Sequence, residues 1–305
     1  MKKYNIFLTI FIGFILICMV ISPSKYVLAT YCGITAWALN VLPSVLPFMF
    51  FTKLLSSFGN VEVLTRPFTK PCKALFKTSS PSAYVFLMAI ISGYPIGAKM
   101  TSDLYLQGKI TQSDAYKMTS FCSTSGPMFI VGAVGTIMFQ NPFIGYIILL
   151  SHVLSAILNG ILYRNLKAKE SSQIALDDKD VKKDLSQIVT DSALSILSVG
   201  VIISIFFVII TALDPIFRIF PSPICELLKG SIEITKGCME LSRCFNIKLA
   251  TILASFVISF GGFSTIVQSM TFLSKIKMPT GLFVLQKITH GILSALITIP
   301  LTLLL

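Results

Sequence analysis

Long apolar segments separated by short polar connections dominate the pattern of this chain. A helix of about 20 apolar residues crosses a hydrocarbon core of about 30 Å. Runs of about this length lie near residues 6–21, 29–51, 143–163, 188–213 and 280–305. No small-x-small cleavage site closely follows the first run, so we expect residues 1–27 to remain as a transmembrane anchor. The pattern predicts an all-α polytopic membrane protein.

Three further apolar segments are short or interrupted by Ser, Gly and Pro. Residues 84–91 stop at the tip 92–97, and residues 249–258 stop at the tip 259–264. Each tip is followed by a second short arm, and two short arms around a Gly-rich tip predict a re-entrant hairpin. A third break, at residues 121–127, interrupts a longer apolar segment and predicts a broken transmembrane helix.

The two predicted hairpins occupy matching places in two halves of the chain. Residues 28–165 and 188–305 form these halves, and a polar linker at 166–187 separates them. We therefore predict two inverted repeats after the N-terminal anchor. Paired Gly/Pro-interrupted segments in corresponding positions are the sequence pointer to a transporter binding site.

The residues at the three breaks are suited to bind a solute. Backbone N–H groups at a helix start lack an intrahelical partner, and several such N-termini together favour carboxylate or phosphate groups. Hydroxyls add donors and acceptors, and glycines permit close backbone approach. Helix packing is the alternative, because small residues also line helix–helix contacts. The predicted solute-binding residues at the breaks are Ser92, Gly93, Tyr94, Pro95, Gly97, Ser123, Thr124, Ser125, Gly126, Ser259, Gly261, Gly262 and Ser264.

Three charged or amide side chains near these breaks are further candidates for the solute site. Lys99 could pair with an anionic solute, or it could snorkel to the interface or pair with Asp103. Glu233 lies in a segment too polar for a simple span, where it could bind the solute or carry a coupling cation or proton. Gln268 follows the last tip by about one turn and is a weaker candidate. His290 is expected to pack against a neighbouring helix or to hydrogen-bond it.

Composition and charge fit a membrane protein and argue against a soluble domain or a nucleic-acid-binding protein. Of the 305 residues, 54% are hydrophobic and 12% are charged, against about 25% charged in soluble domains. The net charge of +12 comes from lysines and arginines that lie mostly between the apolar runs. There they act as topology signals and lipid contacts, and they do not indicate nucleic acid. Their positions predict that the N-terminus and residues 164–184 are cytoplasmic.

Residues that could catalyse a reaction or hold a metal ion are few. The chain has two histidines, and its seven cysteines include no CxxC pair, so we expect no metal site. It has no nucleophile–base pair, P-loop or dinucleotide-binding glycine pattern, so we expect neither an enzyme nor a bound cofactor. Without an ATP site, transport would be secondary or facilitated.

The same segments resemble a known family. Residues 92–99, 121–130, 230–237 and 259–264 are similar to those of the sporulation integral membrane protein YlbJ family, and the resemblance covers nearly the whole chain. That family carries two nucleoside-recognition (Gate) domains and is similar in plan to concentrative nucleoside transporters. The resemblance implies a multi-pass protein of the outer forespore membrane. It also implies passage of dipicolinic acid, a planar dianion, from mother cell to forespore.

We therefore expect a transporter of a small anionic solute that sits in a lipid bilayer. A homo-oligomer is compatible with the sequence. Two alternatives stay open at this point. One is a sporulation membrane protein that assembles or senses without transporting, and the other is a nucleoside transporter.

Overall fold

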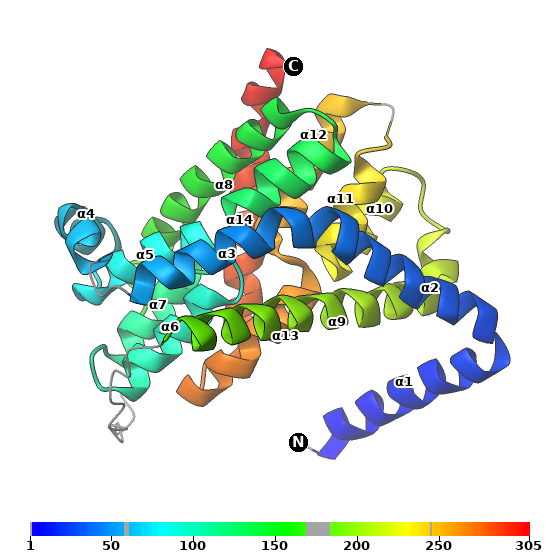
Figure 1. Ribbon diagram of the computed structural model, residues 1–305, viewed down its shortest axis with the longest axis horizontal. Helices are drawn as coiled ribbons and strands as arrows, with labels where there is room; N and C mark the ends of the chain where they lie inside the picture. Colours follow the sequence, from blue (N-terminus) through cyan, green and yellow to red (C-terminus); the bar gives the residue numbers. More distant parts are fainter. Residues whose placement is uncertain (1, 58–60, 169–183, 245) are drawn as a thin grey trace.

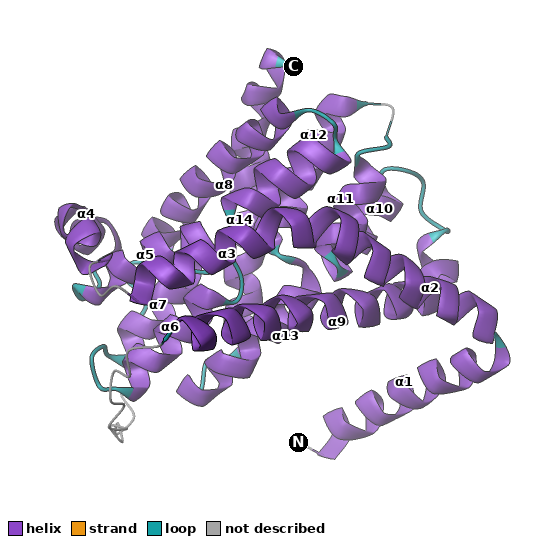
Figure 2. Ribbon diagram, viewed as in Figure 1, coloured by secondary structure: helices purple, strands orange, loops and turns teal. Residues whose placement is uncertain are grey.

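The structure is a computed structural model that describes residues 2–57, 61–168, 184–244 and 246–305. Helices dominate these ranges, and no strand occurs in them (Figure 2). The α-helices are α1 (Lys2–Ile21), α2 (Pro23–Ala36), α3 (Leu42–Ser57), α4 (Val61–Phe76), α5 (Pro81–Ser92), α6 (Ile96–Leu106), α7 (Gln112–Phe121), α8 (Pro142–Leu162), α9 (Leu185–Phe217), α10 (Ile224–Ile232), α11 (Ile234–Leu241), α12 (Ile247–Phe260), α13 (Gly262–Leu273) and α14 (Thr280–Leu301). Two π-helical segments and two 3₁₀ turns complete the order: η1 (Trp37–Val41), η2 (Met128–Met138), η3 (Ser274–Ile276) and η4 (Thr302–Leu304).

Five helical segments of the described chain are long and apolar enough to cross a membrane. They are Pro23–Leu55, Pro142–Leu162, Leu185–Phe217, Ile247–Ile276 and Thr280–Leu304. The all-α polytopic fold is thereby confirmed, and four of these segments match spans predicted from the sequence. The first apolar run forms α1, which lies at the edge of the bundle (Figure 1).

The second predicted span stays helical through Pro43 and Pro47. Proline removes one backbone donor and crowds the carbonyl one turn earlier, which usually breaks a helix. Here the π-helical turn η1 widens the helix just before Pro43. Ser44 Oγ also donates to the Asn40 carbonyl at 3.2 Å. The chain therefore continues as a helix from α2 through η1 into α3, packed along α9 (Figure 1).

The hairpin predicted at residues 259–264 is wrong. α12 and α13 belong to one segment of 30 residues that is long enough to span, with a break at Gly261. Gly261 and Gly262 take the left-handed backbone conformation, with φ angles of 88° and 65°, which lets the helix break locally. A Ser/Gly break looks the same in sequence at a hairpin tip and inside a span, because only the packing of the two arms distinguishes them.

The second helical pair is formed instead by α10 and α11, on either side of Glu233. A Cβ atom on Gly237 would collide with the Cα atom of Gly230, so the two helices touch backbone to backbone. α5 and α6 form the pair in the first half, where Gly97 lies against Ala89. Short helix pair, broken helix and full helix thus occur twice in order, as α5–α6, α7–η2, α8 and as α10–α11, α12–α13, α14. The inverted relation of the two halves stays a prediction.

The centre of the bundle is built by α8, α12 and α14. The hydroxyl oxygens of Ser255 and Ser294 lie 2.6 Å apart, and Thr298 Oγ1 donates to Ser255 Oγ at 2.7 Å. These residues are buried, and Gly291 lets α14 approach Phe256 on α12. Small residues and hydroxyl bonds between helices favour close packing in a bilayer. The three helices therefore form a fixed frame for the breaks beside them.

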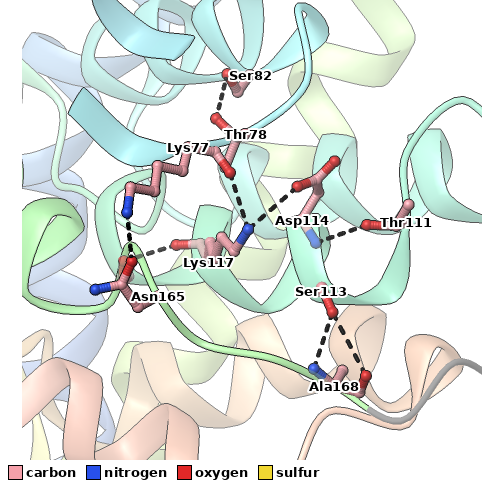
Figure 3. Close-up of polar contacts among 10 residues, drawn as sticks. Lys77, Thr78, Ser82, Thr111, Ser113, Asp114, Lys117, Asn165 and Ala168 are labelled. Atoms are coloured by element: carbon pink, nitrogen blue, oxygen red, sulfur yellow. Dashed lines mark hydrogen bonds and ion pairs between the residues drawn. The ribbon is translucent and has the colours of Figure 1, made fainter. Parts of the chain in front are cut away.

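Residues from two distant basic connections meet at one end of the bundle (Figure 3). Lys117 Nζ on α7 donates to the Lys77 carbonyl at 2.9 Å, and Lys77 Nζ donates to Asn165 Oδ1 at 2.8 Å. Arg164 Nη2 donates to the Ala74 carbonyl in α4 at 3.0 Å. The two basic connections therefore lie together, and the cytoplasmic location of residues 164–184 stays a prediction. Most of the predicted linker, residues 169–183, lies outside the described residues.

The close contact between α10 and α11 makes a prediction for stability. Gly237→Ala should destabilise the protein, because the added methyl group meets the α10 backbone. Overpacking of this kind costs about 1–3 kcal/mol, so the thermal unfolding midpoint in detergent should fall by about 2–10 °C. Gly281→Ala is the matched control, since a Cβ atom there meets open space. Equal midpoints for the two variants would contradict this packing.

Candidate functional site

One cavity of about 90 Å³ is lined by residues at or near four helix breaks. They are residues 93–95 between α5 and α6, residues 122–127 between α7 and η2, Glu233 between α10 and α11, and Gly261 between α12 and α13. Polar residues at or close to all four breaks line the cavity: Ser92, Tyr94, Ser125, Glu233, Thr235, Ser264, Thr265 and Gln268. Segments far apart in the sequence thus contribute to one polar surface.

Apolar residues of the two long spans form much of the remaining wall of this cavity. The first span and α9 contribute Val41, Val45, Phe48, Met49, Val199 and Ile203. A cavity with a few convergent polar groups and an apolar wall is typical of a small-molecule site. The lining therefore combines polar groups from the breaks with an apolar wall from the long spans.

Predicted solute-binding residues from all three sequence breaks line the cavity. They are Ser92, Gly93, Tyr94, Ser125, Gly126 and Ser264. The separate candidates Glu233 and Gln268 line the cavity as well. Thr235 and Thr265 also line it, although the sequence analysis does not select them. The sequence signal for both was available, because each follows a predicted residue within one helical turn.

The other residues predicted at the breaks lie outside the cavity lining: Pro95, Gly97, Ser123, Thr124, Ser259, Gly261 and Gly262. The packing alternative holds for Gly97, where a Cβ atom would collide with the Cys122 carbonyl oxygen. Gly93 combines both roles, since a Cβ atom there would lie 2.5 Å from Gly126 N. These two glycines let the turn between α5 and α6 lie directly against the break between α7 and η2.

Lys99 is exposed and is absent from the cavity lining, so the structure does not bring it to the site. The cation buried beside the breaks is Lys287 on α14, whose surface is 2% exposed. Its Nζ donates to Tyr94 Oη at 2.6 Å and to the Ser123 carbonyl at 2.7 Å. A lysine inside an apolar span is a sequence signal for function, and the prediction overlooked it.

Glu233 is 2% exposed and lines the cavity between α10 and α11. Its Oε2 accepts a hydrogen bond from Lys236 N at 2.8 Å, which caps the start of α11. Within the described ranges no ion pair involves Glu233; the Lys236 ammonium pairs with Glu240 instead. A buried carboxylate without a cationic partner is unfavourable in its charged form. Glu233 is therefore the group in the lining best placed to gain a proton or a cation.

Two buried histidines connect the breaks through α8 and α14. Ser125 N–H donates to His152 Nε2 at 2.9 Å. Neutral His152 therefore carries its proton on Nδ1, which donates it to Ser259 Oγ, 2.7 Å away. His290 Nε2 lies 3.2 Å from the His152 carbonyl oxygen, which confirms the predicted hydrogen bond to a neighbouring helix. The breaks at Ser125 and Ser259 are thus joined by one imidazole.

The breaks also offer hydrogen-bonding groups that remain unused. The hydroxyls of Ser123 and Thr124 are buried and have no hydrogen-bond partner among the described residues. In addition, α6, η2, α11 and α13 all begin at the breaks, where first-turn N–H groups lack an intrahelical acceptor. Solute oxygens can accept such hydrogen bonds, and helix N-termini favour negative charge.

Comparison with known proteins shows similarity over nearly the whole membrane bundle. Across an alignment of 336 residues, the chain is 28% identical to the sporulation integral membrane protein YlbJ of Bacillus subtilis (strain 168). The alignment covers 96% of this chain and 82% of that protein. No protein-family model and no solved structure matches the chain. With its apolar spans, the chain is a multi-pass integral membrane protein, and it is similar over nearly its whole length to a sporulation integral membrane protein.

Proposed function

We propose that this protein transports a small anionic solute, and that the solute is dipicolinic acid passing from mother cell to forespore. The observation that supports this best is the convergence of four interrupted helices on one polar cavity. Interrupted helices at membrane depth are tolerated where they line a cavity, and they form the solute sites of secondary transporters. Similarity to a sporulation integral membrane protein supports the cellular setting.

The chemistry of the cavity suits a planar aromatic dicarboxylate. Ser92, Ser125 and Ser264 present hydroxyls from three different breaks, and Gln268 adds an amide. These groups can donate to carboxylate oxygens, while Phe48 on the apolar wall can pack against a ring. A nucleoside offers a ring and hydroxyls as well, but it lacks the negative charge that the helix N-termini favour. The site therefore supports the anion over the nucleoside.

The volume of the cavity implies that solute entry needs movement. About 90 Å³ is well below the about 300–1,000 Å³ of typical small-molecule sites, so a ring with two carboxylates needs a wider cavity. The pairs α5–α6 and α10–α11 are the elements suited to move, because each is short and meets the cavity at its break. Displacement of one pair at a time would open the cavity to one side of the membrane, as alternating access requires.

Uptake of labelled dipicolinate by the purified protein in liposomes tests the proposed function. The wild type should take up dipicolinate in preference to uridine, a neutral nucleoside. Ser264→Ala removes a cavity hydroxyl and should weaken apparent affinity about 2- to 10-fold, as for one hydrogen bond of about 0.5–1.5 kcal/mol. The control Ser198→Ala removes an exposed hydroxyl of α9 that donates to the Leu194 carbonyl, and it should change nothing.

Two outcomes of the uptake experiment would contradict the proposal. Absence of uptake for every solute would favour an assembly or sensing role. Preferential uptake of uridine would favour a nucleoside transporter.

Glu233 predicts a dependence of dipicolinate binding on pH. Its carboxylate lines the cavity and repels a dianion, so binding is favoured when Glu233 carries a proton. Between about pH 6 and 8 ordinary carboxyl groups of the solute stay ionised, and wild-type affinity should fall as the pH rises. Glu233→Gln keeps an acceptor for the α11 cap and removes the charge, so affinity should be higher and nearly constant. A loss of binding in Glu233→Gln, measured by calorimetric titration, would overturn this role.

A further inference from the structure

Lys287 is a buried cation without a carboxylate partner. Its surface is 2% exposed, and within the described residues no ion pair with Asp or Glu involves it. An ammonium group buried in this way is unfavourable unless its surroundings stabilise the charge. The groups around Nζ therefore explain why the chain places a lysine here.

Three acceptors surround the Nζ atom. Tyr94 Oη lies at 2.6 Å, the Ser123 carbonyl oxygen at 2.7 Å and His290 Nδ1 at 3.4 Å. An ammonium group has three N–H donors and no acceptor, so each of the three neighbours can accept one hydrogen bond from it. The tyrosine hydroxyl can direct its own proton to the Ile258 carbonyl oxygen at 3.4 Å. The arrangement matches the charged form of Lys287 and uses all of its donors.

The ammonium group reaches the end of one interrupted helix directly and the end of another through Tyr94. The acceptor Ser123 lies two residues after the end of α7, and Ile258, whose carbonyl lies near Tyr94 Oη, belongs to the last turn of α12. Unpaired carbonyls give the C-terminal end of a helix a negative charge of about half a unit. The ring of Tyr94 adds its face, with Nζ 4.8 Å from the ring centroid. Carbonyls and helix C-termini of this kind hold the coupling sodium ion or proton of secondary transporters.

We propose that Lys287 is a tethered cation that occupies the coupling-cation position, so that the protein moves its solute without sodium. The ammonium group joins the turn between α5 and α6, through Tyr94, to the break after α7, through Ser123. A bound metal ion would make the same connection. This inference rests on the proposed transport function and adds its ion dependence.

The position of Lys287 also relates the cation to the solute. Tyr94 lines the cavity and contacts the ammonium group directly. Lys287 thus holds a positive charge behind the tyrosine that faces the solute, and this charge favours an anion in the cavity. The exposed Lys99 cannot contribute in this way, because it lies away from the lining.

Wild-type protein provides the first test. Its thermal unfolding midpoint and its dipicolinate uptake should be the same in sodium, potassium and choline chloride at equal ionic strength. Saturable stabilisation by sodium alone, or uptake that requires sodium, would overturn the inference. Sodium-dependent uptake would contradict only the sodium independence and would still support transport of the solute.

Lys287→Ala provides the second test, because it empties the position and leaves its acceptors in place. The thermal unfolding midpoint of Lys287→Ala should fall by about 3–10 °C. Sodium or methylammonium should restore most of this loss, whereas the larger choline should not. Lys287→Met replaces the aliphatic part of the lysine side chain and removes the charge. This variant should be less stable than the wild type, and its thermal unfolding midpoint should not respond to these cations. Lys99→Ala is the control on an exposed lysine and should match the wild type.

The rescue measurement needs no transport activity. Recovery of Lys287→Ala with small cations would support the cation position even if the liposomes took up no solute. Equal responses of Lys287→Ala to sodium, methylammonium and choline would show that the position binds no cation and would contradict the inference.

Discussion

A backbone donor or acceptor cannot stay unpaired in hydrocarbon, yet this protein interrupts its helices four times around one cavity. Each break finds partners in other elements. The Ser125 N–H donates to His152, the Ser123 carbonyl accepts from Lys287, and Glu233 caps α11. The breaks therefore depend on one another and on the frame of α8, α12 and α14. The hydroxyl of Thr124, which is buried beside the breaks and lies outside the cavity lining, has no hydrogen-bond partner among the described residues.

Two buried charges of opposite sign are kept in separate places. Glu233 belongs to the cavity lining, whereas Lys287 lies behind Tyr94 at the ends of α7 and α12. Within the described chain the two do not form an ion pair with each other. Because the carboxylate lines the cavity and the ammonium does not, gain of a proton by Glu233 changes the charge that a solute meets.

The apolar spans could be predicted because the thickness of the bilayer fixes their length. The break at residues 122–127 could be predicted as well, since Ser, Gly and Pro interrupt an otherwise apolar run. The second hairpin could not, because residues 259–264 look like a tip in sequence and the polar α10–α11 segment does not look like two membrane helices. Its tip residue Glu233 was still found, because a carboxylate in such a segment stands out.

The lysines show most clearly what the sequence leaves undetermined. Lys99 and Lys287 both lie within or beside a predicted membrane segment. Which of them is buried depends on the rotation of α6 and α14 about their own axes, and packing against other helices sets that rotation. A single sequence does not contain this packing. Spacing from a Gly-rich tip therefore favoured Lys99, whereas contacts with Tyr94 between α5 and α6 and with Ser123 after α7 favour Lys287.

An experimental structure of the protein in a lipid nanodisc with dipicolinate decides whether the four breaks form a solute site. The solute should appear between Ser92, Ser125 and Ser264, with its carboxylates towards the helix N-termini and its ring towards Phe48. The cavity should be wider than the present 90 Å³. Dipicolinate bound elsewhere in the bundle, with this cavity unchanged at saturating concentration, would contradict the assignment.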